Sequence, residues 1–222
     1  MICISGGGSF IGRAIIRILD EQNIAYTVIS RSRIYDKLDE YLDSKKCRTF
    51  IHCAWSMDYE NPFNNKENDK LNTAVLDGIK GVDNVIFISS IHVLIKDSAY
   101  TQDKIKWENI FFDSVNEQGN KMSTMYLPHL IAPEVGQNNN SVIYKFYNKW
   151  KMSQSLDVYN DEDIHYTDFK NFKDVLLQAL TSQTMLKVAP KFYIASVSHI
   201  KSEFLSNKAL CPIIERLKKS NI

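Results

Sequence analysis

The sequence predicts an α/β fold built on a doubly wound parallel sheet, with a small C-terminal lobe. Strand-like and helix-like patterns alternate through the first half of the chain, which indicates parallel strands joined by helical crossovers. The expected strand at 85–88 is apolar throughout, as central parallel strands are. A glycine-rich turn also joins the first expected strand to the first helix. In such sheets ligands bind beyond the carboxyl ends of the strands.

The elements of the first half follow from apolar spacing and turn residues. A helical spacing of apolar residues, such as Leu71, Val75 and Ile79, marks one buried face of a helix that Gly81 ends. The expected strands are 1–4, 25–29, 49–53, 85–88 and 123–127. The expected helices are 11–19, 35–42, 71–81 and 100–115, and a polar loop is expected over 58–65.

The second half of the chain is less regular. Phe169, Phe172 and Leu176 belong to a clearly amphipathic helix over 169–180. The polar run 138–140 predicts a loop between secondary-structure elements. The remaining expected elements are helices at 142–150 and within 199–217, and short strands at 157–159 and 192–195.

Composition and charge exclude several classes of protein. The chain has 222 residues, 44% of them hydrophobic and 24% charged, and its net charge is +1. Its basic residues are scattered, so we expect no nucleic acid partner. No apolar run approaches the roughly 20 residues of a membrane span, and no signal peptide precedes the first strand. The four cysteines show neither metal-ligand nor disulfide spacing, so we expect a cytoplasmic protein without a metal.

The turn between the first strand and helix, Ser5-Gly6-Gly7-Gly8-Ser9-Phe10-Ile11-Gly12, predicts a dinucleotide site. Gly6 suits the tight turn, and Gly12 allows the helix to pack close to the sheet. The positive end of the helix then faces the pyrophosphate. One position departs from the motif: Ser9 stands where the middle glycine is expected, with Gly8 one place early. The sequence therefore predicts a Rossmann-like dinucleotide-binding domain.

The end of the second strand bears on the choice of cofactor. An acidic residue there accepts hydrogen bonds from the ribose of NAD. This chain instead has Ser30-Arg31-Ser32-Arg33, with no acid before Asp36. Arg31 and Arg33 can pair with a 2′-phosphate, which favours NADP(H). Two solvated loop arginines, and therefore NAD(H), remain the alternative.

A tyrosine and a lysine share one face of the helix that follows the strand at 85–88. Tyr100 and Lys104 lie four residues apart, which places them on the same side. A nearby ammonium favours the phenolate, so we expect Lys104 to lower the pKa of Tyr100. The pair can therefore transfer protons near neutral pH.

These motifs, in this order, resemble those of the extended short-chain dehydrogenase/reductases. The match is closest to the nucleotide-sugar epimerases, dehydratases and 4-ketoreductases. It covers residues 1 to about 185 and is strongest over the first 130. The segments that carry it are 5–12, Phe50-Ile51-His52-Cys53-Ala54-Trp55, Phe87-Ile88-Ser89-Ser90-Ile91-His92-Val93, Tyr100-Thr101-Gln102-Asp103-Lys104, Met125-Tyr126-Leu127-Pro128-His129 and Asp163-Ile164-His165-Tyr166-Thr167-Asp168.

The resemblance implies a role for each matching residue. Tyr100 is the expected acid/base, and Lys104 is expected to tune it and to hold the nicotinamide ribose. Ser90, with Ser89 as the alternative, is expected to hydrogen-bond the keto oxygen of the substrate. The expected cofactor contacts are Gly6, Gly8, Ser9, Phe10, Ile11, Gly12, Arg31, Arg33, Cys53, Ala54, Lys104 and Pro128. Weaker candidates for substrate contacts are His92, Trp55 and His129.

The resemblance also implies a domain division and a reaction. Residues 1–127 form the expected Rossmann domain and 128–222 the substrate lobe, with about 163–185 returning to the first domain. Two departures are the ten-position step from Ser90 to Tyr100, shorter than is usual in the family, and the absence of an arginine just before Asp163. The expected activity is NADPH-dependent reduction of a nucleotide-linked 4-keto-6-deoxy sugar, as in the deoxysugar biosynthesis that supplies surface polysaccharides.

Three further possibilities stay open at this point. An NAD-dependent nucleotide-sugar 4-epimerase is the enzymatic alternative. A non-catalytic dinucleotide-binding regulatory protein is the alternative from another class. A homodimer is possible through the helix that carries Tyr100, where Trp107, Phe111 and Phe112 suit either a core or an interface.

Overall fold

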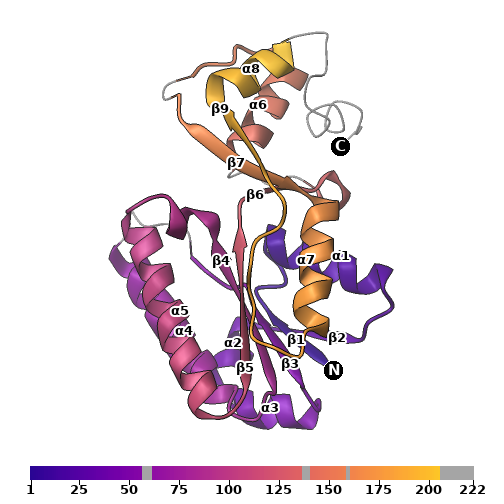
Figure 1. Ribbon diagram of the computed structural model, residues 1–222, viewed down its shortest axis with the longest axis vertical. Helices are drawn as coiled ribbons and strands as arrows, with labels where there is room; N and C mark the ends of the chain where they lie inside the picture. The colour runs from indigo at the N-terminus through magenta and orange to yellow at the C-terminus, as the bar shows by residue number, and fades with distance from the viewer. Residues whose placement is uncertain (57–61, 137–140, 159–160, 206–222) are drawn as a thin grey trace.

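The computed structural model describes residues 1–56, 62–136, 141–158 and 161–205 (Figure 1). Its larger part is a six-stranded sheet in the order β2-β1-β3-β4-β5-β8, in which every neighbouring pair is parallel. This architecture confirms the predicted doubly wound parallel sheet. The strands are β1 (Ile2–Ser5), β2 (Tyr26–Ile29), β3 (Thr49–His52), β4 (Asn84–Ser90), β5 (Lys121–Leu127) and β8 (Lys187–Val188).

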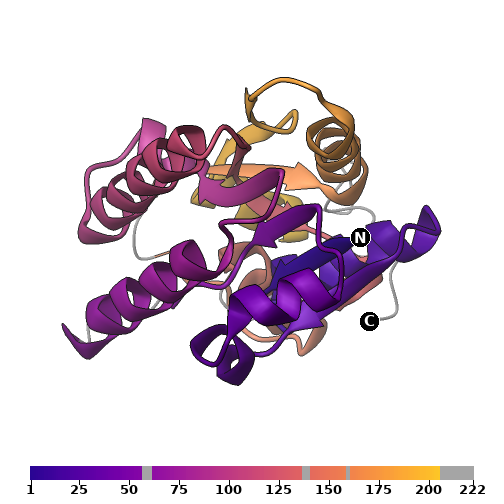
Figure 2. The same cartoon turned by 90° about the horizontal axis from the view of Figure 1, so that it is seen from below.

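Successive side chains along each strand point to opposite faces of the sheet, and helices bury both faces. One face packs its apolar side chains, such as Ile4 and Ile86, against α1 (Phe10–Glu21) and α7 (Phe169–Thr181). The other face packs Phe50 and Phe87 against helices that include α4 (Pro62–Gly78) and α5 (Ala99–Glu117). Figure 2 shows these helices on the two sides of the sheet. Helices on both faces explain why the central strands are apolar throughout.

In the part that the structure describes, the C-terminal lobe is a second, smaller sheet covered by helices α6 and α8. Its strands run in the order β6-β7-β9, and they are β6 (His129–Ile131), β7 (Asp163–Asp168) and β9 (Tyr193–Ser196). The lobe packs α6 (Val142–Lys151) and α8 (Val197–Leu205) over a core that contains Tyr144 and Phe204. After β7 the chain returns to the large sheet as α7, which lies next to α1 (Figure 1). Lys173 of α7 pairs with Glu21 of α1 at 2.8 Å.

Several expected boundaries need correction. The single helix expected at 35–42 is two short helices, α2 (Arg31–Tyr35) and α3 (Leu38–Ser44), because Lys37 adopts the left-handed conformation with φ 52°. Residues 157 and 158 form no strand, and residue 159 lies outside the described part. The loop 138–140 also lies outside the described part, as do residues 58–61 of the expected loop at 58–65, whereas 62–65 open α4 instead of continuing that loop. The helix expected within 199–217 is described only as far as Leu205.

Two further observations concern partners. Trp107 and Phe111 of α5 lie in the core of this chain rather than on its surface, with exposures of 5% and 0%. Among the helices that the structure describes, none combines the length and the apolar character that a membrane crossing requires.

Candidate active site

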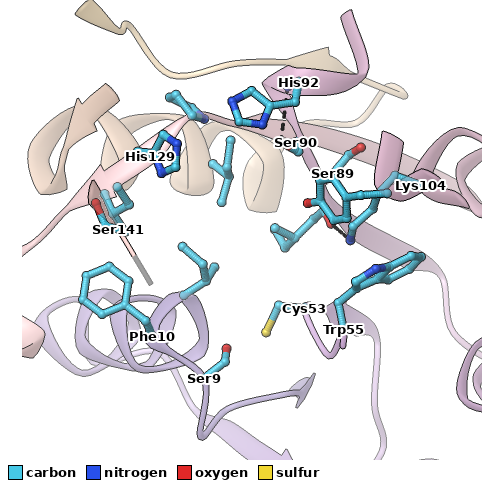
Figure 3. A pocket seen from close by; sticks show the side chains of 16 residues that line it. Ser9, Phe10, Cys53, Trp55, Ser89, Ser90, His92, Lys104, His129 and Ser141 are labelled. Carbon is cyan, nitrogen blue, oxygen red and sulfur yellow. Dashed lines mark hydrogen bonds between the residues drawn. The ribbon is translucent and has the colours of Figure 1, made fainter. Parts of the chain in front are cut away.

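A pocket of about 290 Å³ lies beyond the carboxyl ends of β3, β4 and β5, between the large sheet and the lobe (Figure 3). The position agrees with the rule that ligands of doubly wound sheets bind at this edge. Its lining residues are Ser9, Phe10, Ile11, Cys53, Trp55, Ile88, Ser89, Ser90, His92, Tyr100, Lys104, Leu127, Pro128, His129, Leu130 and Ser141.

The end of the glycine-rich turn lies on one side of this pocket, which Ser9, Phe10 and Ile11 line, whereas the predicted contacts Gly6, Gly8 and Gly12 are not among the lining residues. Gly6 has a φ of +75°, and a Cβ there would lie 2.6 Å from the backbone nitrogen of Ala54. A Cβ on Gly12 would lie 2.2 Å from the carbonyl oxygen of Gly6, whereas a Cβ on Gly8 would meet no atom within 4 Å. Of these three glycines, Gly8 therefore leaves open space next to the backbone. Open space next to a backbone at the N-terminus of a helix is the kind of place where a phosphate group can bind.

Ser9, the departure from the glycine motif, has a structural role. It is the N-cap of α1, and its side-chain oxygen accepts a hydrogen bond from the Gly12 backbone N–H at 3.0 Å. Its own backbone N–H donates to the Gly6 carbonyl oxygen at 2.9 Å. A serine at this position thus closes the turn and begins the helix.

Lys104 is buried between the sheet and an indole ring. Its ammonium donates to the Ile88 carbonyl oxygen at 2.9 Å and lies 3.6 Å from the centroid of the Trp55 ring. Burial lowers the pKa of Lys104 to about 7. Lys104 is therefore held between its charged and neutral forms near neutral pH, and Trp55 covers the group expected to hold a ribose.

Tyr100 lies in the first turn of α5, at the end of the short connection from β4. A capping box of Ser98 and Thr101 begins the helix, and Thr101 also donates to the Lys96 carbonyl oxygen at 3.0 Å. Burial raises the pKa of Tyr100, while a side-chain hydrogen bond with Ser90 partly opposes this rise. The ten-position connection thus brings Ser90 and Tyr100 into contact. The expected fall in the pKa of Tyr100 is not observed, because burial outweighs its polar contacts.

The two serines at the end of β4 differ in their partners. The Ser90 side-chain oxygen accepts a hydrogen bond from the His92 backbone N–H at 3.2 Å. The Ser89 hydroxyl is buried, and no hydrogen-bond partner for it lies among the described residues. Both hydroxyls line the pocket, and Ser90 is the one that contacts Tyr100.

The arginines that were predicted to select the cofactor lie apart from the lining of the pocket. Arg31 pairs with Glu67 of α4 at 3.0 Å, and both side chains are more than half exposed. Arg33 is 3.9 Å from Asp36 and lies over the Tyr41 ring. A carboxylate, Glu67, therefore accompanies Arg31 at the end of β2.

Most of the remaining residues predicted to contact the cofactor line the pocket, but Ala54 does not. Phe10, Ile11, Cys53 and Pro128 line the pocket, whereas Ala54 packs in the core on the α4 side of the sheet. Burial raises the pKa of the Cys53 thiol to about 12, and this thiol donates to the Ser5 carbonyl oxygen at 2.8 Å. Cys53 is therefore a packed thiol rather than a nucleophile.

The weaker candidates His92 and His129 face each other across the lobe side of the pocket (Figure 3). Their ring centroids are 5.5 Å apart. Burial lowers the pKa of His129 to about 4, and it also lowers the pKa of His92. Within the described ranges, the histidines, cysteines and carboxylates form no group of three or more arranged to hold a metal ion.

Comparison with solved structures identifies the architecture. The UDP-glucose 4-epimerase of Thermus thermophilus, solved with NAD, aligns with a TM-score of 0.78 and 13% identity over 91% of this chain and 81% of its own. The fold is that of the nucleotide-sugar epimerases. The UDP-glucose 4-epimerase of Thermotoga maritima, solved with UDP-glucose, aligns at 0.77 and 15% over 93% and 83%. MoeE5 with UDP-glucose and NAD aligns at 0.80 and 14% over 91% and 80%.

The epimerase fold confirms the resemblance seen in the sequence. No protein-family model and no curated protein matches the chain. The likeness is thus one of fold, with 13–15% identity to the three structures named above.

Two residues near the pocket were missed in the sequence. The Ser141 hydroxyl at the N-terminus of α6 is buried and lines the pocket, with no hydrogen-bond partner among the described residues. Arg13 donates to the Gly8 carbonyl oxygen at 2.9 Å and so places a cation at the glycine turn. Arg13 could have been predicted to lie near the glycine turn, because it follows Gly12 directly in the sequence. Ser141 lies in a less regular part of the sequence, where no pattern points to a residue of the pocket.

Proposed function

We propose that this protein is an NAD(P)-dependent oxidoreductase that reduces a keto group on a nucleotide-activated sugar. The observation that carries the proposal is the contact between Ser90 and Tyr100, in one pocket with Lys104 and next to the glycine-rich turn. A proton donor, a hydroxyl that can orient an oxygen and a phosphate cradle are the parts such a reaction needs.

The state of Tyr100 supports the reductive direction. With its pKa raised by burial, the phenol is protonated at neutral pH. A protonated phenol can donate to a keto oxygen, whereas removing a proton from a sugar hydroxyl would first require loss of its own. A nicotinamide cofactor, when bound, would supply the hydride. The chain supplies the proton from Tyr100 and, through the Ser90 hydroxyl, the position of the keto oxygen.

The glycine turn fits a dinucleotide cofactor on the evidence of its backbone. Gly8 leaves space that no side chain fills, and the N-terminus of α1 together with Arg13 offers positive charge there. Lys104 would hold the ribose after its contact with Trp55 is released. Arg31 and Arg33 favour NADP(H), while Glu67 next to Arg31 and the NAD in two of the similar structures favour NAD(H).

The lobe side of the pocket suits a nucleotide-sugar substrate. The first turn of α6 presents backbone N–H groups and the positive helix end, which stabilise phosphate oxygens. The buried Ser141 hydroxyl, whose partner is not among the described residues, lines the same wall. A 4-keto-6-deoxy sugar is the proposed substrate. A 4-epimerase reaction is the second candidate, favoured by the likeness to epimerase structures that contain NAD or UDP-glucose.

A spectrophotometric assay tests the reaction. NADPH and NADH oxidation is followed by the loss of nicotinamide absorbance with CDP-, GDP-, UDP- and dTDP-linked 4-keto sugars, and chromatography of UDP-sugar mixtures detects epimerisation. We expect oxidation with at least one keto sugar. Binding of the cofactor without turnover of any substrate would instead indicate a regulatory dinucleotide-binding protein.

A matched pair of variants tests the assigned proton donor. Tyr100→Phe removes the phenol hydroxyl from the pocket and should lower kcat by about 100-fold or more. Tyr35→Phe removes the hydroxyl of a tyrosine that is 38% exposed and lies outside the pocket lining, and should leave kcat within about twofold. Equal activity of the two variants would refute the role of Tyr100.

A further inference from the structure

Two buried charges of opposite sign lie four residues apart on α5. In the part of the chain that the structure describes, three side chains of Asp, Glu, Lys or Arg are buried, and Lys104 and Glu108 are two of them, each 4% exposed. Residues at this spacing occupy the same face of a helix, with Cβ atoms about 5–6 Å apart. Lys104 lines the pocket (Figure 3), and Glu108 is not among the lining residues. Glu108 therefore lies one helical turn behind a group of the candidate site.

Glu108 holds α5 against two strands of the large sheet. Its Oε1 atom accepts a hydrogen bond from the Tyr126 hydroxyl of β5 at 2.6 Å and lies 3.2 Å from the Lys187 ammonium of β8. Burial and this hydrogen bond raise the pKa of Tyr126, so the phenol stays a donor. The Lys187 side chain is 59% exposed, so the ion pair is open to solvent on one side. Glu108 thus joins the helix that carries Tyr100 and Lys104 to the sheet.

Anchoring of the helix alone does not require a charge at this position. A buried carboxylate loses its hydration, and apolar side chains of similar volume can often replace a buried ion pair without loss of stability. A buried charge has a specific effect where it faces a second ionisable group, because it changes the balance between the charged and neutral forms of that group. For Glu108 that group is Lys104, one turn earlier on the same buried face of α5.

The ionisable groups around Lys104 come from α5, from β3 and from the segment that follows β3. They are His52, Cys53, Tyr100, Asp103 and Glu108. Burial lowers the pKa of Lys104 to about 7, and Cys53, Asp103 and Glu108 oppose this fall. The Cys53 thiol has a pKa of about 12 and is neutral near pH 7, so the two carboxylates supply the negative charge. Asp103 is half-buried, whereas Glu108 acts from inside the protein, where solvent ions screen a charge little.

We propose that Glu108 is a positioning residue for Lys104, which anchors α5 at β5 and β8 and stabilises the ammonium form of the lysine with its buried charge. The inference rests on the proposed function, because it concerns the amine that is expected to hold the cofactor ribose. Without the carboxylate, less of the amine would be charged near pH 7. Loosening of the helix would act in the opposite direction, since water would return to the ammonium and stabilise its charge. The sign of the change therefore separates an electrostatic role from a merely structural one.

Nuclear magnetic resonance of the ligand-free protein with isotope-labelled lysine measures this sign. The Lys104 signal is assigned by its absence in Lys104→Met. Glu108→Gln keeps a side-chain oxygen for the Tyr126 hydroxyl but removes the charge, and should lower the pKa of Lys104 by about one unit. Tyr126→Phe is the matched control, because it removes the hydrogen bond to Glu108 and keeps the carboxylate, and it should not lower that pKa. An unchanged or raised pKa of Lys104 in Glu108→Gln, or an equal fall in both variants, would overturn the inference.

A surface variant provides the test if Glu108→Gln does not fold. Lys187→Gln removes the exposed partner of Glu108 and leaves the carboxylate less neutralised. The pKa of Lys104 should then rise by a few tenths of a unit. Absence of any rise would overturn the inference by this route.

Titration with NADPH and NADH separates the inference from the proposed function. A fall of about one unit reduces the charged fraction of Lys104 at pH 7 from about one half to about one tenth. Glu108→Gln should therefore bind dinucleotide about fivefold more weakly at about pH 7, and the difference should become small near pH 5. A lowered pKa with unchanged affinity would leave the action of Glu108 on Lys104 in place and would refute the assignment of Lys104 to the cofactor. Failure of the unmodified protein to bind either dinucleotide would refute the proposed function without affecting the pKa measurement.

Discussion

The ammonium of Lys104 lies 3.6 Å from the centroid of the Trp55 indole ring. Trp55 occupies a position two residues after Cys53, at the end of a segment that resembles a family motif, and its ring covers the lysine expected to hold the cofactor. A cation–π contact between desolvated groups is worth roughly 1–2 kcal/mol. Binding of a dinucleotide through Lys104 must therefore displace a contact that the protein already makes.

Trp55→Ala should tighten dinucleotide binding. Loss of a contact worth about 1 kcal/mol would lower the Kd by about fivefold. Trp55→Phe keeps a weaker aromatic contact and should give a smaller change. Fluorescence titration with NADPH and NADH measures both, and a weaker affinity in the alanine variant would show that the indole instead helps to hold the cofactor.

The two glycines at the ends of the Gly8–Gly12 segment should respond oppositely to an added methyl group. Gly12→Ala places a Cβ 2.2 Å from the Gly6 carbonyl oxygen and should lower the melting temperature severely. Gly8→Ala meets no atom within 4 Å, so it should fold normally and lose affinity for dinucleotide. Thermal melts and NADPH titration separate the two effects. A Gly8→Ala protein with normal affinity would place the pyrophosphate elsewhere.

Stability should rise with pH because of Lys104. Its pKa is about 7 in the folded protein and near 10.5 when unfolded, so the unfolded state binds more protons between these values. The free energy of unfolding therefore gains at most about 1.4 kcal/mol per pH unit from this group above about pH 7. Lys104→Met should remove the gain. Urea melts at several pH values give the difference, and parallel curves for the two proteins would contradict the depressed pKa.

Two buried hydrogen bonds of His52 connect Ser5 of β1 to Asn72 of α4. The Nδ1 atom of His52 lies 2.7 Å from the Ser5 hydroxyl oxygen, and Nε2 lies 2.7 Å from the Asn72 side-chain oxygen. Asn72→Ala would leave the Nε2 hydrogen without its acceptor and should cost about 1–3 kcal/mol of stability. Thr73→Ala, at the next and exposed position of α4, provides a control on the same helix. Equal urea midpoints for the two variants would rule out a structural role for these hydrogen bonds.

His52 should also make the protein sensitive to acid. Burial lowers its pKa to about 4, below the value near 6.5 of the unfolded chain. The unfolded state therefore binds the extra proton between these values, and the stability that His52 contributes is lost as pH falls from about 6.5 to about 4. His52→Asn should flatten this part of the stability curve, measured by urea melts across the range.

The sequence alone predicted a parallel doubly wound sheet, five of its six strands and the residues expected at its carboxyl edge, but neither the order of the strands nor β8. Apolar periodicity along the chain is a local property, and parallel strands align their carboxyl ends by topology, so Ser90, Tyr100 and the glycine turn were expected to meet. The break at Lys37 escaped detection because a left-handed residue other than glycine carries no strong local signal.

Only the tertiary structure decided the electrostatics of the site. The pKa of Tyr100 is raised rather than lowered, Lys104 lies against Trp55, and Arg31 pairs with Glu67 from another helix. Each of these depends on burial and on side chains distant in sequence, and the desolvation of a charge has no local sequence signature. The spacing of motifs along the sequence predicted which polar residues lie at the carboxyl edge of the sheet. The packing of the folded chain determined the protonation states and the partners of these residues.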